Sequence, residues 1–269
     1  MYISSFMATL IYSFFISICG VAFFMESCFQ MHIEYKTGDI IFIGASTFVT
    51  YLFDGVMAKY KRYNNFIALL KDNIFNLLLM LAATLVCLYY VKDYNTDFNI
   101  YLLHLMVLSV AYSIPVFGGR ALRTIPLLKT ILIIYVWVIV GTVLPSKLYH
   151  IQPANFSNII WEHIFFIAML AIAFDMRDYE QDLREKIGTL PTLLGEKRAS
   201  YSAFILGPLA VVVAMTINLD YGVSLAVADF SAMLILFRSP SLKTSAGFAY
   251  FTDGMILVRL FLVWWAVKY

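Results

Sequence analysis

The sequence predicts an all-α integral membrane protein, and two observations support this class: the composition and the length of the apolar runs. Of the 269 residues, 62% are hydrophobic and 13% are charged, whereas a soluble domain carries about a quarter charged residues. The formal net charge is +2. A nucleic-acid-binding domain would show a strong basic excess, so no nucleic-acid partner is expected. We expect one polytopic domain over residues 1–269.

About nine membrane-spanning helices are predicted. A hydrocarbon core about 30 Å thick needs about 20 apolar residues per helix. The segments that meet this rule lie approximately at 3–25, 39–57, 73–91, 99–114, 125–144, 157–174, 201–217, 221–236 and 247–267. The fourth and the eighth are short, so eight or ten helices are the alternatives. No signal-peptide pattern precedes the first, which we expect to be retained.

The basic residues predict the orientation, because cytoplasmic loops retain Lys and Arg. The loops after the first, third and fifth spans carry only Lys36, Lys92 and Lys147, and the loop after the seventh carries none. We therefore expect a multi-pass protein of the cell membrane, with a cytoplasmic N-terminus and the C-terminus on the opposite side. The intervening segments, predicted to be cytoplasmic, hold Lys59, Lys61, Arg62 and Lys71, then Arg120, Arg123 and Lys129, then Arg177, Arg184, Lys186, Lys197 and Arg198, and finally Arg238 and Lys243.

Three carboxylates follow the sixth span at helical spacing. Asp175, Asp178 and Asp182 stand at i, i+3 and i+7, which is one helix face. Like charges on one face repel unless a cation offsets them. Oxygen ligands at this spacing suit Mg²⁺, which takes one or two carboxylates together with substrate phosphates. The alternative is a solvated acidic helix end beside neighbouring basic residues.

Two further elements are predicted at the same end. Asp54 lies near the end of the second span. We expect a bundle of two four-helix halves and one additional helix. Each half would then supply one acidic helix end to a shared cavity. The segment Tyr112 to Lys129 contains Pro115, Gly118, Gly119 and Pro126, which break helices. Its cations, Arg120, Arg123 and Lys129, fit either positive-inside topology or phosphate binding. Together these elements suggest a lipid-linked diphosphate substrate.

These residues resemble a known family. The stretch D-M-R-D-Y-E-Q-D-L-R-E-K-I-G-T-L-P-T-L-L-G, Asp175 to Gly195, closely resembles the second aspartate motif of the UbiA superfamily of intramembrane prenyltransferases. That motif is N-D-x-R-D-x-x-x-D, followed by a basic segment and T-L-P-x-x-L-G. The family's Y-S-x-P region and the helix after it resemble Tyr112-Ser113-Ile114-Pro115 with Arg120, Leu122, Arg123, Pro126, Lys129 and Trp137. The last span fits more loosely, with Tyr250, Asp253 and Gly254.

The resemblance implies a UbiA-like bundle and a Mg²⁺-dependent transfer of a prenyl or polyprenyl group. The donor would be an allylic prenyl diphosphate, and the acceptor would be a small hydrophobic or aromatic molecule of a lipid pathway. The protein would be surrounded by membrane lipid. Asp178 and Asp182 would coordinate Mg²⁺ at the diphosphate, with Asp175 nearby and Asp54 on the opposite helix. The residues expected at the diphosphate are Arg120, Lys59, Arg123, Lys129 and Tyr112. No catalytic residue is assigned.

The first aspartate motif departs from the family pattern. The usual N-D-x-x-D-x-x-x-D is represented by Thr50, Tyr51, Asp54 and Ala58, so one of its four acidic or amide positions is kept. Phe174 stands where the second motif often has Asn. A weakened first metal site is expected.

Two alternative functions fit part of the sequence. A non-catalytic isoprenoid-binding membrane protein or transporter would share the cavity without the chemistry. The stretch Asp54-Gly55 with Ala58, and then Asp72, resembles the signature of CDP-alcohol phosphatidyltransferases. Four positions depart from that signature: Tyr51 and Asn76 replace aspartates, Lys59 an arginine and Ala68 a glycine. This alternative also leaves Asp175 to Gly195 unexplained. Elsewhere, Asp229 and Arg259 are expected to pair between helices, and His104 and His163 to be structural.

Overall fold

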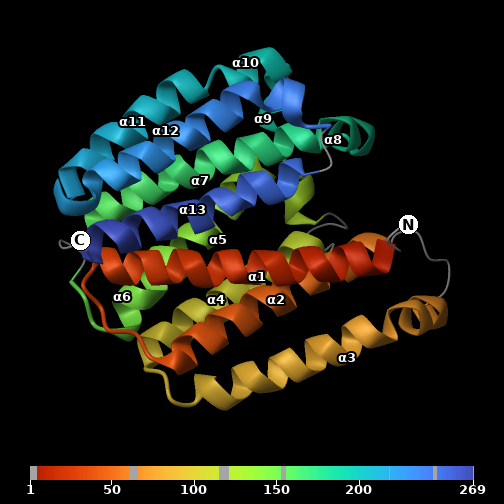
Figure 1. The fold of residues 1–269 in the computed structure, drawn as a ribbon. Coiled ribbons are helices and arrows are strands. Elements are labelled where there is room, and N and C mark those ends of the chain that lie inside the picture. The colour runs from red at the N-terminus through yellow and green to blue at the C-terminus, as the bar shows by residue number, and fades with distance from the viewer. Residues whose placement is uncertain are drawn as a thin grey trace.

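The computed structural model describes residues 5–60, 66–114, 121–152, 156–217, 219–244 and 247–268. All regular structure in these residues is helical, and long helices run side by side in a bundle (Figure 1). The predicted all-α class is confirmed. The long helices are α1 (Ser5–Gln30), α2 (Thr37–Tyr60), α3 (Phe66–Val91), α4 (Thr96–Ser113), α7 (Ser157–Arg177), α11 (Ala203–Ile217), α12 (Leu219–Leu242) and α13 (Phe248–Lys268).

One further rod is composite. It runs through α5 (Leu128–Val138), the π-helical turn η2 (Ile139–Val143) and α6 (Leu144–Leu148). A Cβ atom at Gly141 would lie 2.3 Å from the Phe23 ring, so a glycine is needed where η2 meets α1. The short helices are η1 (Leu122–Thr124), α8 (Tyr179–Glu185), α9 (Leu190–Leu194) and α10 (Glu196–Ser200).

The bundle matches the predicted number of spans closely. Within the described residues, eight helical segments are long and apolar enough to cross a membrane, by length and composition. The predicted fourth span corresponds to α4, whose first turn contains Asp97 and Asn99 and which falls outside these eight. Leucines 78, 81, 85 and 88 form an exposed stripe along α3. Such a stripe suits a helix that faces lipid.

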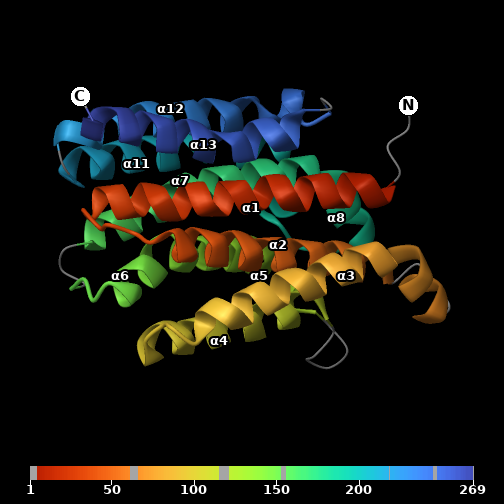
Figure 2. The same cartoon turned by 60° about the horizontal axis from the view of Figure 1, so that its bottom comes forward.

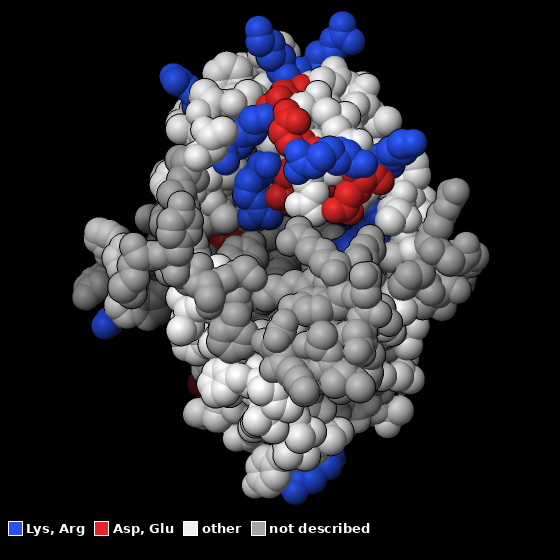
Figure 3. Space-filling view, turned by 90° about the vertical axis from the view of Figure 1, so that its right-hand side faces the viewer, with Lys and Arg blue, Asp and Glu red and all other residues white. Residues whose placement is uncertain are grey.

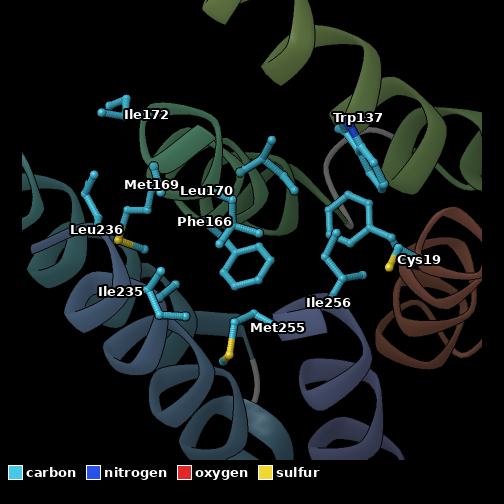
Figure 4. Close-up of a cluster of buried hydrophobic side chains, with 14 of the residues drawn as sticks. Cys19, Trp137, Phe166, Met169, Leu170, Ile172, Ile235, Leu236, Met255 and Ile256 are labelled. Carbon is cyan, nitrogen blue, oxygen red and sulfur yellow. The ribbon is translucent and has the colours of Figure 1, made fainter. Parts of the chain in front are cut away.

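Helix α1 holds the two sides of the bundle together. It packs against α2, α13 and η2, while α13 also packs against α12. Figure 2 shows α1 and α7 between the layer of α11, α12 and α13 and the layers that contain α2, α3 and α4. The main hydrophobic core lies around α7, where Phe166, Met169 and Leu170 contact apolar residues of α1, α12 and α13 (Figure 4).

A buried charge network joins the helices at mid-bundle. The Arg259 guanidinium on α13 donates to Glu26 Oε2 on α1 at 2.9 Å and to Asp229 Oδ1 on α12 at 3.2 Å, and it also pairs with Glu162 on α7. All four residues have essentially no exposed surface. The predicted pairing of Asp229 with Arg259 is confirmed. His163 lies in the same network, with Nε2 3.5 Å from Glu26 Oε2.

Candidate functional site

A cavity of about 410 Å³ opens among α1, α2, α4, α5, α7 and α13. It lies toward the end of the bundle where α7 ends and α5 begins. Seen from that end, basic and acidic side chains stand side by side over α8 to α10 (Figure 3). The cavity lining includes three carboxylates that are expected at the site, Asp54, Asp175 and Asp178, together with Lys129 and Tyr112.

Lys129 stands among the three aspartates of the second motif. Its Nζ donates to both oxygens of Asp182, at 2.9 and 3.1 Å. The same atom is 3.3 Å from Asp175 Oδ1 and 3.5 Å from Asp178 Oδ2. We call these three aspartates the acidic wall. The Lys129 ammonium lies within 3.5 Å of all three aspartates and offsets their repulsion.

Local backbone geometry fixes the position of Lys129. Leu127, with a positive φ of 61°, precedes the first turn of α5, and its N–H donates to the Gly188 carbonyl at 2.5 Å. A Cβ atom at Gly188 would lie 2.9 Å from Pro126 Cβ and 3.1 Å from its Cα. A glycine at 188 therefore allows the segment after α8 to approach the start of α5. This contact brings the acidic wall and Lys129 together.

Asp178 is also paired with Arg177. The Arg177 Nε donates to Asp178 Oδ1 at 2.8 Å, and Nη2 donates to Oδ2 at 3.2 Å. Burial alone would raise the pKa of the Asp178 carboxyl, but Arg177 and, to a smaller extent, Lys129 hold this pKa below its ordinary value. For Asp182, burial raises the pKa of the carboxyl above its ordinary value although Lys129 opposes the shift. Asp178 therefore stays ionised at neutral pH.

Asp54 approaches the cavity from α2. Its Oδ1 accepts a hydrogen bond from Ser113 Oγ at 2.7 Å and lies 3.4 Å from Arg123 Nη1. The neighbouring first-motif positions are not acidic. Thr50 Oγ1 donates to the Ser46 carbonyl of its own helix, and the Tyr51 hydroxyl accepts from Trp137 Nε1 at 3.1 Å. Among the described side chains of α2, Asp54 is therefore the carboxylate that lines the cavity.

The cavity changes from charged to apolar along its length. On α5, Lys129 is followed by Ile133 and Trp137 in the lining, and on α7 Asp178 and Asp175 are followed inward by Leu170 and Ile167. Eight residues of α-helix separate Lys129 from Trp137, which is about 12 Å at 1.5 Å per residue. Such a cavity suits an elongated molecule with an anionic head and an apolar tail.

The structure separates the expected site residues into three groups. Asp54, Asp175, Asp178, Lys129 and Tyr112 share the cavity. Asp182 lies outside the lining and faces Lys129, and Arg123 lies outside it beside Asp54. The Lys59 side chain and Arg120 fall outside what the structure describes. The roles given to these residues in metal and diphosphate binding stay predictions.

Other lining residues were not assigned from the sequence. Tyr12 donates to Asp253 Oδ2 at 3.0 Å, and Arg177 lines the cavity beside Asp178. Arg177 stands within the quoted second motif and could have been assigned from it. Tyr12 could not, because nothing distinguishes it from the other 17 tyrosines of the chain.

The donor atoms fit Mg²⁺ by their chemistry. Asp54, Asp175 and Asp178 present carboxylate oxygens to one cavity, and the buried Asp175 Oδ1 accepts no hydrogen bond. Mg²⁺ prefers such oxygens in combination with substrate phosphates. Among the described residues, no three acidic, histidine or cysteine side chains form a ready-made metal site. The fit is therefore to a metal ion that arrives with a phosphate ligand.

Comparison with solved structures identifies the fold. The chain is similar to a structure of a UbiA homolog from Archaeoglobus fulgidus bound to GPP and Mg²⁺, with a TM-score of 0.61 and 13% sequence identity. The likeness covers 98% of this chain and 99% of that one. No family model and no curated protein matches the sequence. The UbiA-like fold predicted from the second aspartate motif is confirmed.

Proposed function

We propose, from the fold shared with a UbiA homolog, that this membrane protein is a Mg²⁺-dependent prenyltransferase. It would move a prenyl or polyprenyl group from an allylic diphosphate to a small hydrophobic or aromatic acceptor. The neighbour of the same fold binds GPP and Mg²⁺. The proposal transfers the chemical class of that ligand to this chain and leaves the acceptor open.

The observation that carries the proposal is the change from charge to apolar surface along one cavity. Lys129 and Arg177 offer positive charge at one end, while Ile133, Trp137 and Ile167 line the other. A prenyl diphosphate has the same polarity, with an anionic head and a hydrocarbon tail. Tyr51 and Tyr112 also line the cavity.

The chain's own residues would support ionisation of the donor. Positive charge from Lys129 and Arg177 would stabilise the diphosphate as the carbon–oxygen bond breaks and its electron pair leaves with the oxygen. The allylic cation that results would face the rings of Tyr51, Tyr112 and Trp137, whose π faces attract cations. The acceptor would supply the electron pair of the new bond and release a proton. The apolar end of the cavity, with Ile133, Trp137 and Ile167, would exclude competing water.

Asp54 and Asp178, with Asp175 beside them, are the residues that would hold Mg²⁺. When bound, Mg²⁺ would neutralise diphosphate charge and favour departure of the leaving group. Asp182 was expected to share this role, but both its oxygens contact Lys129. Arg123 and, by prediction, Arg120 and Lys59 would add positive charge at the cavity entrance.

The charged end of the bundle would face the cytoplasm. The loops predicted to be cytoplasmic carry most of the chain's loop lysines and arginines. The first described turn of α1 and the last turn of α13 lie at opposite ends of the bundle (Figure 1). We therefore propose a cytoplasmic N-terminus and a C-terminus on the opposite side of the cell membrane.

The proposal is tested by a transfer assay on the purified protein. Radiolabelled geranyl diphosphate is supplied with Mg²⁺ and, in separate reactions, with hydroxybenzoate, naphthoate and glycerol-phosphate lipid acceptors. We expect a labelled prenylated product with at least one acceptor, its loss with a chelator or with Asp178→Asn, and its retention with Asp93→Asn. Asp93 is an exposed carboxylate in the loop between α3 and α4, so it controls for the same chemical change.

The alternatives give different outcomes in the same assay. Donor that binds without transfer to any acceptor would favour a non-catalytic isoprenoid-binding protein. Transfer from a CDP-alcohol, with geranyl diphosphate inert, would favour a phosphatidyltransferase. The environment of Tyr51 argues against the second alternative, because a phenol that accepts from Trp137 stands where that signature needs an aspartate.

A further inference from the structure

We infer that the Lys129 ammonium occupies the position that a divalent ion would otherwise take between Asp175, Asp178 and Asp182. The same ammonium binds the donor's diphosphate directly. Asp182 is then an anchor for the lysine instead of a metal ligand. This inference rests on the proposed function. The inference adds to the proposed function a distinction between the cations that the protein supplies and the metal ions that arrive with the donor.

The spacing of the acidic wall matches an ammonium group. Four carboxylate oxygens lie between 2.9 and 3.5 Å from Lys129 Nζ. Hydrogen bonds from nitrogen to oxygen span about 2.7–3.2 Å, whereas Mg²⁺ binds oxygen at about 2.0–2.1 Å. An ion at the Nζ position would require all three side chains to close by nearly 1 Å or more. The packing therefore suits nitrogen at this point.

The position of Lys129 in its helix supports the same assignment. It stands in the first turn of α5, where the helix dipole disfavours a cation. Helix stability thus gives no reason for a lysine here. The compensating contacts are those to the acidic wall, and Thr130 adds a hydrogen bond to Asp175 Oδ2 from the next position.

Hydrogen-bond capacity leaves part of the ammonium for a ligand. An ammonium has three N–H donors. Two hydrogen bonds go to Asp182, whereas Asp175 Oδ1 and Asp178 Oδ2 make the longer contacts, at 3.3 and 3.5 Å, which a ligand oxygen can replace. Because Lys129 also lines the cavity, a third N–H can meet a diphosphate oxygen while Asp182 stays bound. Asp182 itself does not line the cavity, which agrees with a role behind the lysine.

The charge balance predicts what happens without Lys129. The acidic wall carries three carboxylates, and Arg177 compensates Asp178. Removing the lysine leaves the other two, Asp175 and Asp182, without a cation in a largely buried setting. Because such a setting attracts a divalent ion, Lys129→Ala is expected to gain a metal site that the native chain lacks. Lys129→Arg keeps the charge and is the matched control.

The test counts bound metal ions in the presence of a donor analogue. Purified protein is saturated with the non-ionising thiolo analogue of geranyl diphosphate and titrated with Mn²⁺, and free Mn²⁺ is measured by electron paramagnetic resonance. We expect Lys129→Ala to bind about one Mn²⁺ more per protein than the native chain. Lys129→Arg should match the native chain. Equal numbers in the native chain and in Lys129→Ala would overturn the inference.

A second variant keeps the test decisive if Lys129→Ala does not fold. Asp182→Asn should leave the number of bound Mn²⁺ ions unchanged, whereas Asp178→Asn should lower it. A loss of Mn²⁺ with Asp182→Asn would identify Asp182 as a metal ligand and contradict the inference. A native chain that does not bind the analogue at any Mn²⁺ concentration would reject the proposed function itself. A native chain that binds the analogue but shows the same Mn²⁺ count as Lys129→Ala would reject the inference about Lys129 alone.

Discussion

Asp54 has a more open setting than the aspartates of the acidic wall. Its side chain is 37% exposed, compared with 3% for Asp182 and 0% for Asp175. Ser113 and Arg123 both contact its Oδ1, so with respect to the described side chains Oδ2 is the oxygen left for a ligand. Asp54 is therefore well placed to bind a metal ion that enters with the donor.

Asp54→Asn is expected to weaken Mg²⁺-dependent binding of the thiolo analogue. A charge-assisted contact contributes about 1.5–3 kcal/mol, which corresponds to roughly 10- to 150-fold in affinity. Fluorescence titration at fixed Mg²⁺ measures the change. Asp93→Asn serves as the control, and an unchanged affinity in Asp54→Asn would remove Asp54 from the site.

Residue spacing predicted part of this site and missed the rest for a physical reason. The i, i+3, i+7 spacing predicted one continuous helix face, but α7 ends just before Asp178 and α8 begins just after it, so Asp175 and Asp182 lie on two helices. The three aspartates still lie together, because all of them contact Lys129. The partner of Asp182 is Lys129, 53 residues away in the chain. That pairing depends on how α5 packs beside α7 and α8, which local spacing does not encode.

At the scale of elements, two contacts hold the site and the bundle. The approach of Gly188 to Pro126 links the segment after α8 to the start of α5. The Arg259 network links α13 to α1, α7 and α12 through carboxylates on each. The pairing of Asp229 with Arg259 was predicted from the sequence. The contact with Glu26 was not, because Glu26 is 233 residues from Arg259 and stands just after the predicted first span, 3–25.

Gly188→Ala tests the contact beneath the site. The added methyl group would lie within 3.1 Å of two Pro126 atoms, and overpacking of this kind costs about 1–3 kcal/mol. We expect weaker binding of the thiolo analogue, because α5 and Lys129 would shift relative to the acidic wall. Gly247→Ala, where a Cβ atom meets nothing within 4 Å, should bind normally. Equal binding by both variants would count against this role of the contact.

Arg259→Gln tests the charge network. Removing one partner of a buried ion pair costs about 3–5 kcal/mol, because the other charges are left uncompensated. The unfolding temperature in detergent should fall by several degrees. Lys243→Gln breaks a partly exposed pair with Glu196, worth about 0–1 kcal/mol, and should change it little. A native-like unfolding temperature for Arg259→Gln would show that the network does not stabilise the fold.

At the scale of the whole molecule, the positions of the spans were predictable because apolar length is a local property. Each predicted span overlaps a long helix or the composite rod, although α12 extends to Leu242, beyond the predicted end at 236. Pro240 lies inside α12, and the polar residues before it make the end of the helix hard to locate from hydropathy. The layers of the bundle follow from long-range packing and were not predictable in this way.

The orientation is tested by labelling introduced cysteines in intact cells. With the free cysteines Cys19, Cys28 and Cys87 replaced, a membrane-impermeant reagent should label Asp93→Cys and leave Glu180→Cys unlabelled until the cells are opened. Both positions are exposed on the protein. Labelling of Glu180→Cys from outside would place the acidic wall on the outer face and contradict the proposed orientation.

The central claim is that the cavity among Asp54, Asp178 and Lys129 binds a prenyl diphosphate with Mg²⁺. Calorimetric titration with the thiolo analogue of geranyl diphosphate tests this most directly, since it needs no acceptor. We predict saturable binding with Mg²⁺ that is lost with a chelator, weakened about ten-fold or more by Asp178→Asn, and kept in Asp93→Asn. Binding of equal strength with and without Mg²⁺, or in Asp178→Asn, would contradict the account.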